Sequence, residues 1–202
     1  MASLSSASTI VARSPGRRSL WRRAAGTVLR AEARHALAHE WRRTLAGEPA
    51  LPRRPVRNVA VVCWGNLCRS PFAAALLAKR APHLTVASFG LAAEEGDGAD
   101  PRAIALAPRW GVELEAHRAR RLATQHVHEA DLVLVMEAQH AAAIARRWSI
   151  ARTQVRLLGD FLPTRPFAIR DPWDQEEAVW LDVYTRIDAA TARLAARIGA
   201  AR

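Results

Sequence analysis

Val59-Ala60-Val61-Val62-Cys63-Trp64-Gly65-Asn66-Leu67-Cys68-Arg69-Ser70-Pro71 is the most informative segment of the chain, because strand, loop and helix signals follow one another in it. It opens on an apolar, β-like run, and the Ala/Leu-rich residues 72–79 that follow it are typical of a helix. A strand, a tight loop and a helix start in this order bring successive backbone N–H groups together, and the helix N-terminus adds about half a positive charge there. The stretch therefore predicts an anion site in its loop.

The residues at the two ends of this loop indicate what the site would do. Cys63 begins the loop and Arg69 ends it, with five residues between them. Backbone amides and a guanidinium stabilise a thiolate, and a fixed fork of N–H donors matches the charge and shape of a phosphate group. A lysine at position 69 would keep the charge and lose the bidentate geometry. A buried structural cysteine is the alternative, but it leaves the spacing to Arg69 unexplained.

Further along the chain, β-like and helical patterns alternate. Strands are expected over residues 59–63, 84–88, 131–136 and 154–158, and helices over residues 71–80, 101–110, 118–126, 138–148 and 176–198. This alternation predicts an α/β fold, a four-stranded parallel sheet with helices on both faces in three layers. Ligands of such sheets bind beyond the carboxyl ends of the strands, where the loop after Val62 is expected to lie. Asp100-Pro101 is interpreted as a helix N-terminus.

The N-terminal part differs from the rest in charge. Residues 1–58 hold twelve arginines against three glutamates, a net charge of +9, so the remaining residues carry only +2 of the total of +11. We divide the chain into a basic extension, 1–56, whose Ser-rich start is expected to be disordered, and a catalytic domain, 57–202. Within the extension, residues 19–46 predict an amphipathic helix, since an apolar residue recurs at every fourth position: Trp21, Ala25, Leu29, Ala33, Leu37, Trp41 and Leu45. Such a basic helix suits an anionic membrane surface or a partner, although a solvated face is the simpler interpretation.

Cysteine usage and hydropathy bear on the compartment. Both cysteines of the chain lie inside the loop, which excludes a disulfide framework and indicates a reducing compartment, the cytoplasm. No apolar run approaches the roughly 20 residues that a membrane-spanning helix needs. The first 31 residues have Arg and Ser but no acidic residue, as in a mitochondrial transit segment. The same Arg/Ala bias, with Lys79 as the single lysine, persists along the whole chain and favours a bacterial coding sequence instead.

The loop resembles that of a known family, the low-molecular-weight protein tyrosine phosphatases. The similar stretches, in the family's order, include residues 62–71, Ser88-Phe89-Gly90, residues 131–136 and Asp171-Pro172, and the resemblance runs from about Asn58 to the C-terminus. It identifies the chain as a bacterial-type member with an N-terminal extension, and it implies a phosphotyrosine-protein phosphatase that needs no metal or other cofactor. The implied partners are phosphotyrosine proteins, among them bacterial tyrosine autokinases that govern exopolysaccharide export, and no nucleic acid is expected.

The resemblance also implies residue roles. Cys63 attacks phosphorus and becomes a phosphocysteine, Arg69 binds the equatorial oxygens, and Ser70 donates a hydrogen bond to the sulfur. Asp171 protonates the leaving phenolate and then activates water, which is general acid–base catalysis of the kind worth about 10²–10⁴ in rate. The remaining loop residues are expected to bind the phosphate through their backbone: Trp64, Gly65, Asn66, Leu67 and Cys68.

Other residues support or depart from this pattern. Asn66 is expected to hold an unusual backbone conformation, supported by Ser88 and His117, while Trp173 forms a flat wall for a phenyl ring. Three departures stand out: Phe89 could crowd the loop's support, Arg170 could weaken Asp171 as an acid, and Asp174 replaces a second aromatic residue.

Several interpretations stay open at this point. Cys68 is either a packing residue or a partner that captures oxidised Cys63 as a disulfide, and Asp171 could be a mere turn former before Pro172. Arsenate reduction is possible on the same scaffold but relays a disulfide through cysteines downstream, which this chain lacks. Phosphoarginine hydrolysis is another possibility, but relatives with that activity carry Thr where this chain has Leu67. Five other histidines are expected at the surface: His35, His39, His126, His128 and His140.

Overall fold

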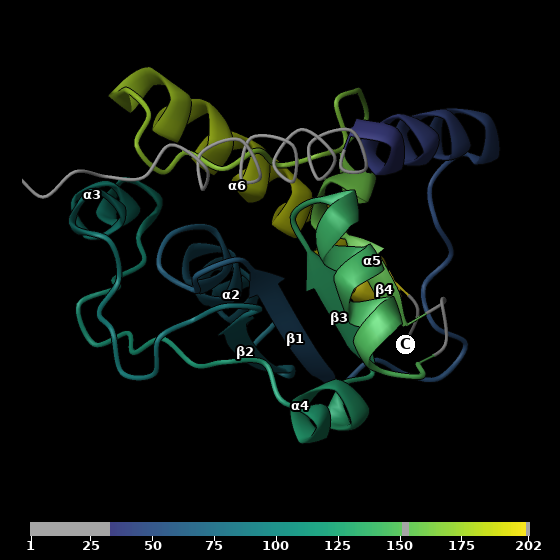
Figure 1. The fold of residues 1–202 in the computed structure, drawn as a ribbon, viewed down its shortest axis with the longest axis horizontal. Coiled ribbons are helices and arrows are strands. Elements are labelled where there is room, and N and C mark those ends of the chain that lie inside the picture. Colours follow the sequence, from purple (N-terminus) through teal and green to yellow (C-terminus); the bar gives the residue numbers. More distant parts are fainter. Residues whose placement is uncertain (1–32, 151–153, 201–202) are drawn as a thin grey trace, which may run out of the picture.

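The computed structural model describes residues 33–150 and 154–200, and its strands form one parallel sheet (Figure 1). The four strands lie in the order β2-β1-β3-β4. They span Asn58–Cys63 (β1), Thr85–Gly90 (β2), Leu132–Val135 (β3) and Val155–Leu157 (β4). β1 is central, since Val61 pairs with Ser88 on one side and with Leu134 on the other. Residues 59–63 of this strand are apolar and buried, as expected for a position in which both faces of the strand are covered. The predicted four-stranded parallel sheet is confirmed.

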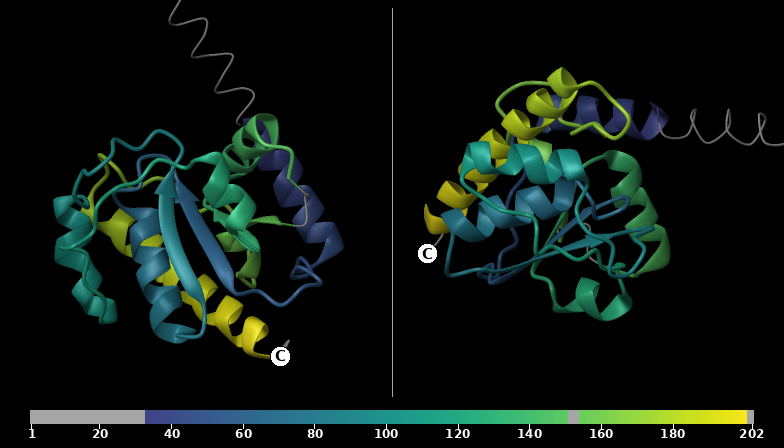
Figure 2. Two further views of the ribbon diagram at one scale, coloured as in Figure 1. Left: turned by 90° about the horizontal axis from the view of Figure 1, so that it is seen from below. Right: turned by 90° about the vertical axis from the view of Figure 1, so that its left-hand side faces the viewer.

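Helices cover both faces of the sheet (Figure 2). Their bounds are Arg69–Arg80 (α2), Pro101–Leu106 (α3), Thr124–Glu129 (α4), Ala138–Arg147 (α5) and Glu177–Ala200 (α6), with 3₁₀ turns at Ala107–Trp110 (η1) and Leu158–Phe161 (η2). Alternate residues of β1 enter two separate cores. Val59, Val61 and Cys63 pack with residues of α2, α3 and α6, whereas Ala60 and Val62 pack with residues of α4 and α5. The three layers follow from this alternation.

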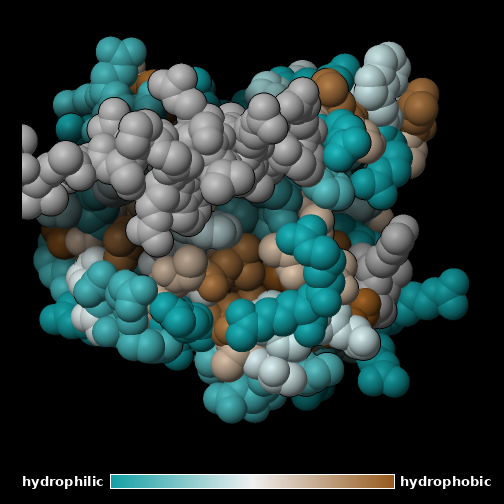
Figure 3. Space-filling view, in the orientation of Figure 1, coloured by the Kyte–Doolittle hydropathy of each residue, from teal (hydrophilic) through white to brown (hydrophobic). Residues whose placement is uncertain are grey.

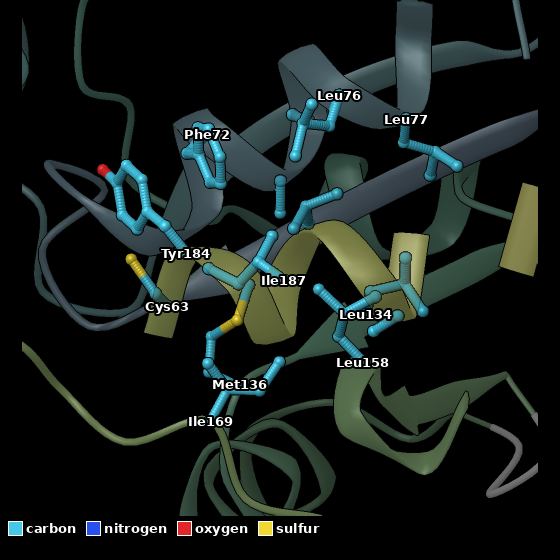
Figure 4. Packing of buried hydrophobic residues seen from close by; sticks show 14 of the residues in the cluster. Cys63, Phe72, Leu76, Leu77, Leu134, Met136, Leu158, Ile169, Tyr184 and Ile187 are labelled. Atoms are coloured by element: carbon cyan, nitrogen blue, oxygen red, sulfur yellow. The ribbon is translucent and has the colours of Figure 1, made fainter. Parts of the chain in front are cut away.

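The core beneath α2 and α6 holds the Cys63 loop in place (Figure 4). The rings of Phe72 and Tyr184 stack with their centroids 3.8 Å apart and their planes 9° from parallel. The Tyr184 hydroxyl then donates a hydrogen bond to the Cys68 carbonyl at 3.2 Å. The last helix of the chain is thereby tied to the loop that precedes α2.

Two predicted helices differ from the structure. Residues 118–123, the first part of the predicted helix 118–126, are not helical. The Gly90 amide donates to the Arg120 carbonyl at 2.9 Å and the Leu122 amide donates to the Gly90 carbonyl at 2.8 Å, so this segment runs beside the edge of β2. Helix α4 begins only at Thr124, because tertiary pairing at the sheet edge overrides local helical preference. The predicted helix 101–110 becomes 3₁₀ after Leu106, where Pro108 has no N–H for an α-helical bond.

The N-terminal extension contains a helix where the structure describes it. Residues 33–46 are helical, and the rest of the predicted helix, residues 19–32, lies outside the described residues. The apolar stripe faces away from the domain: Leu37, Trp41 and Leu45 are 60%, 59% and 81% exposed. The predicted amphipathic helix thus contacts the domain through polar residues. None of the helices in the described part of the chain is long and apolar enough to cross a membrane.

Candidate active site

The Cys63 sulfur lies at the carboxyl end of β1, directly below the start of α2. Cys63 is only 2% exposed. Its Sγ accepts a hydrogen bond from the Asn66 amide at 3.3 Å and lies 3.0 Å from the Ser70 hydroxyl oxygen. Residues 64–68 form the loop between β1 and α2, where the sequence predicts an anion site. The sulfur therefore lies at a helix N-terminus next to a backbone amide and a hydroxyl group, an arrangement that stabilises a thiolate.

Asn66 is the residue that gives the loop its shape. Its φ of +59° lies in the left-handed region, which non-glycine residues rarely adopt. Its side chain donates to Ser70 Oγ at 2.9 Å and accepts from the Arg120 amide at 2.8 Å. Its carbonyl oxygen lies 2.7 Å from His117 Nε2. Burial lowers the pKa of His117, so the ring donates this hydrogen bond while uncharged.

Ser88 does not directly support the backbone conformation of Asn66. It is buried in β2, but in the described part of the chain it forms no hydrogen bond with Asn66, whose amide group is occupied by Ser70 and Arg120. Arg120 lies in residues 118–123, for which the sequence predicts a helix. It supports Asn66 through its backbone amide, so the type of its side chain gives no signal in the sequence, and only the folded structure identifies the contact.

Arg69 is buried at the end of the loop with a cluster of acceptors around it. Its Nη1 donates to the Ile169 carbonyl at 3.0 Å and to Glu137 at 3.1 Å, and its Nη2 donates to Asp171 Oδ2 at 2.6 Å. Its buried Nε–H has no partner among the described residues, so Arg69 keeps a donor for a bound anion. Burial alone would lower the pKa of Arg69, but the negative charges of Cys63, Asp171 and Glu137 outweigh it and raise that pKa. The guanidinium is a permanent cation.

Glu137 and His140 belong to this cluster, although the sequence analysis did not include them in the site. Glu137 follows Met136 just after β3, and a carboxylate at the carboxyl end of a central parallel strand is the signal that could have identified it. The prediction that His140 is a surface residue is wrong, since it is 2% exposed. One face of α5 packs on the sheet, and His140 lies on that face. The Glu137 carboxylate is 3.5 Å from His140 Nε2, yet burial and the positive charge of Arg69 dominate and lower the pKa of His140 to about 3.

The buried His140 is expected to make the protein less stable in mild acid. Between pH 6.5 and pH 3 the unfolded chain binds a proton at this residue and the native protein does not, so protons favour unfolding. At pH 5 this amounts to about 2 kcal/mol of lost unfolding free energy. Urea unfolding at pH 5 and pH 7.5 should show a smaller difference for His140→Gln than for the wild type. The exposed His128→Gln serves as the control, and an equal pH dependence in wild type and His140→Gln would contradict the shift.

Asp171 reaches the site from a loop far away in the sequence. It precedes α6, and its Oδ1 accepts a hydrogen bond from the Trp173 amide at 3.2 Å while its Oδ2 pairs with Arg69. Its side chain is 43% exposed, so one edge of the carboxyl faces solvent. The sequence suggests that Arg170 could weaken Asp171 as an acid. In the structure, the Arg170 guanidinium pairs instead with the Asp182 carboxylate at 3.4 Å. The residue beside the candidate acid therefore points toward α6.

The three aromatic residues that the sequence places at or near the Cys63 loop differ in burial: Phe89 is buried, whereas Trp64 and Trp173 are exposed. Phe89 stacks on His126 with the ring centroids 4.2 Å apart, in the core on the α4 side, so it does not crowd the loop. Trp64 and Trp173 are 56% and 61% exposed, one on the Cys63 loop and the other just after Asp171. Trp173 and Asp174, whose φ is +58°, line a groove of about 290 Å³. The other residues of the groove are Asp100, Pro101, Arg102 and Trp180.

Cys68 differs from Cys63 in its surroundings. Both thiols are free, but burial raises the pKa of Cys68, so this thiol is uncharged at neutral pH and packs in the core under α2 and α6. Capture of oxidised Cys63 by Cys68 stays a prediction. Among residues 33–150 and 154–200, no group of three or more His, Cys, Asp and Glu side chains could hold a metal ion.

Known proteins are similar to the part of the chain that contains this site. The family model described as low molecular weight phosphotyrosine protein phosphatase matches residues 58–202. The low molecular weight protein-tyrosine-phosphatase Wzb of Salmonella typhi is 39% identical over 143 residues, which cover 71% of this chain and 95% of that protein.

Solved structures are similar over the same region. Vibrio vulnificus Wzb in complex with benzylphosphonate has a TM-score of 0.66 and 34% identity, covering 70% of this chain and 99% of that one. The YwlE arginine phosphatase from Geobacillus stearothermophilus has a TM-score of 0.66 and 32% identity, covering 71% and 94%. A loop with Cys63 and Arg69 between β1 and α2, a distant Asp171 that meets it, and a family match across both together lead to one conclusion: the chain belongs to the low molecular weight phosphotyrosine protein phosphatase family.

Proposed function

We propose that this protein hydrolyses phosphotyrosine in proteins through a phosphocysteine intermediate. One observation carries the proposal: a buried thiol accepts from the Asn66 amide at 3.3 Å, lies 3.0 Å from the Ser70 hydroxyl oxygen, and shares a site with a buried guanidinium that contacts a half-exposed carboxyl at 2.6 Å. These are a nucleophile, a phosphate-binding cation and a proton donor. Family membership supports the same activity.

In the first step, Cys63 Sγ forms a bond to phosphorus and the bond from phosphorus to the tyrosyl oxygen breaks. The phosphate oxygens bind the loop amides and the guanidinium of Arg69, whose fixed donors match the charge of the transition state. These oxygens compete with Asp171 for Arg69, so binding of the dianion releases the carboxyl from its ion pair. Asp171, in its protonated form, then gives its proton to the leaving phenolate.

In the second step, water attacks phosphorus and the phosphorus–sulfur bond breaks. Asp171 takes the proton of the water, and inorganic phosphate leaves. The departing Cys63 thiolate is stabilised by the Ser70 hydroxyl and the Asn66 amide, which lie within hydrogen-bond distance of the sulfur. Ser70 therefore assists both formation and departure of the thiolate.

The substrate class is tested by comparing phosphopeptides that share one sequence. We expect a phosphotyrosyl peptide to be cleaved with a kcat/KM at least about tenfold above that for the phosphoseryl or phosphoarginyl peptide, since aromatic contacts of Trp64 and Trp173 are each worth about 1 kcal/mol. The YwlE likeness makes phosphoarginine the alternative to exclude. Leu67 supports the phosphotyrosine class, since the family resemblance implies Thr at this position in phosphoarginine phosphatases. Faster cleavage of the phosphoarginyl peptide would overturn the proposed class. Thiol consumption that depends on arsenate would instead support the reductase alternative.

The partners follow from the same chemistry. Phosphotyrosine proteins are the proposed substrates, and a tyrosine autokinase that governs exopolysaccharide export is the proposed physiological one. The cytoplasm, where thiols stay reduced, is the proposed compartment.

The N-terminal extension is the basis of a second proposal, contact with an anionic membrane surface. Leu37, Trp41 and Leu45 form an exposed apolar stripe on the helix of residues 33–46, and hydrophobic atoms lie among polar ones over this helix at the upper right of Figure 3. Residues 1–58 carry a net charge of +9. An exposed apolar stripe on a strongly basic segment suits a surface of anionic lipid.

This contact is tested with lipid vesicles. We expect the full chain to bind vesicles of phosphatidylglycerol, to ignore vesicles of phosphatidylcholine, and to lose about tenfold in affinity on Leu45→Ser, because burial of one leucine side chain is worth roughly 1.5–3 kcal/mol. Co-sedimentation at low and high salt measures the effect. Equal binding of wild type and Leu45→Ser would contradict the proposal.

A further inference from the structure

The polar face of the N-terminal helix contacts the chain that leads to Asp171. Glu40 on this helix is 9% exposed. Its Oε1 accepts hydrogen bonds from the amides of Phe167 at 2.6 Å and Ala168 at 3.3 Å, and its Oε2 accepts one from Arg165 Nε at 3.1 Å. Figures 1 and 2 show this helix beside the yellow-green chain that follows η2. The buried Glu40 carboxylate thus accepts three hydrogen bonds from residues 165–168, which fixes this segment against the N-terminal helix.

Two further residues of the N-terminal helix, Arg43 and His39, contact the domain close to Glu40. Arg43 donates to the Asp160 carbonyl at 2.8 and 2.9 Å, and its guanidinium lies 4.5 Å from the centre of the Phe167 ring. His39 Nε2 lies 2.6 Å from the Asp160 carboxylate. The helix therefore contacts both η2 and the segment after it.

The contact with Glu40 continues directly to the catalytic cluster. One residue beyond Ala168, the Ile169 amide donates to the Met136 carbonyl at 2.9 Å, and the Ile169 carbonyl accepts from Arg69 at 3.0 Å. Asp171 follows two residues later. Gly159 allows the segment to lie this close to η2, because a Cβ there would come within 1.8 Å of the Phe167 carbonyl oxygen. The segment 167–171 is thus held at one end by Glu40 and at the other by Arg69.

We infer that Glu40 of the N-terminal extension is a positioning residue for Asp171. The inference rests on the proposed function, since it assigns Asp171 the role of general acid. Without the Glu40 carboxylate, two backbone amides lose their acceptor and the segment is free to shift. A misplacement of about 1 Å in a catalytic group can cost about a hundredfold in rate. The extension would in this way act on proton transfer while leaving the Cys63 loop intact.

The test uses the full chain and aryl phosphates that differ in the acidity of the leaving phenol. Phenyl phosphate needs a proton on its leaving group, whereas 2,4-dinitrophenyl phosphate does not. For Glu40→Ala we expect kcat/KM to fall by about tenfold to a hundredfold with phenyl phosphate and by less than about threefold with the dinitrophenyl ester. Glu40→Gln, which keeps an acceptor oxygen for the two amides, should recover most of the activity. Ala38→Gln, at an exposed position of the same helix, is the matched control and should match the wild type with both esters.

The outcomes separate the inference from the proposed function. An equal fall for both esters in Glu40→Ala, or no fall with phenyl phosphate in that variant, overturns the positioning role. Thermal melts of each variant show whether the helix contact only adds stability, in which case both esters respond alike. The proposed function fails on a different result, retention of phosphatase activity by Cys63→Ser.

Discussion

Cys63→Ser is expected to abolish phosphatase activity, with a fall in kcat of about 10⁴-fold or more. The hydroxyl of serine stays protonated at neutral pH, so the amide and hydroxyl donors that face the sulfur have no anion to stabilise. Serine is close to cysteine in size, and the buried position should tolerate it. The variant should therefore bind phosphate esters and not turn them over.

Two measurements check this expectation. Initial rates with 4-nitrophenyl phosphate give the loss of activity, and calorimetric titration with a phosphotyrosyl peptide shows whether the site still binds. A folded variant that binds the peptide and retains more than about a hundredth of wild-type kcat would contradict Cys63 as the nucleophile, because loss of a covalent nucleophile costs far more.

Asp171→Asn is expected to lower kcat/KM for phenyl phosphate by about 10²–10⁴-fold, and to have a much smaller effect with 2,4-dinitrophenyl phosphate. The amide cannot give a proton to the phenolate, and only the poor leaving group requires one. The same substitution removes the carboxylate that pairs with Arg69 at 2.6 Å. Inorganic phosphate, which competes for that guanidinium, should consequently inhibit the variant at a lower concentration than the wild type.

A neighbouring arginine provides the control for Asp171. Arg170 is adjacent in sequence, but it pairs with Asp182 and not with Asp171. Arg170→Gln should keep kcat/KM within about twofold for both esters, as for other exposed ion pairs of small energy. A fall in Asp171→Asn that is equal for good and poor leaving groups would exclude Asp171 as the acid.

The local features of the site could be predicted from the sequence. The apolar run before Cys63 identifies the central strand, and the Ala/Leu-rich run after Pro71 identifies the helix that follows. Both are signals of a few consecutive residues, and the structure has β1 and α2 within two residues of the expected bounds. The left-handed backbone of Asn66 also lies inside this stretch.

The supporting residues were harder to predict because their partners are distant. His140 was expected at the surface, yet it is buried beside Glu137 and Arg69. The segment around Arg120 has a helical pattern but pairs with the edge of β2, and its backbone then reaches Asn66. Long-range hydrogen bonds decide such positions, and a pattern of adjacent residues does not contain them.

The order of strands and helices along the chain and the position of the Cys63 loop follow from patterns in the sequence, because periodicity and loop composition are properties of neighbouring residues. Folding alone brings Asp171 to Arg69 across 102 positions and places Glu40 of the extension against the amides of Phe167 and Ala168. A buried polar group must find its partner wherever the folded chain places one. The residues of the Cys63 loop are therefore neighbours in the sequence, whereas the position of Asp171, the proposed acid, depends on the whole fold.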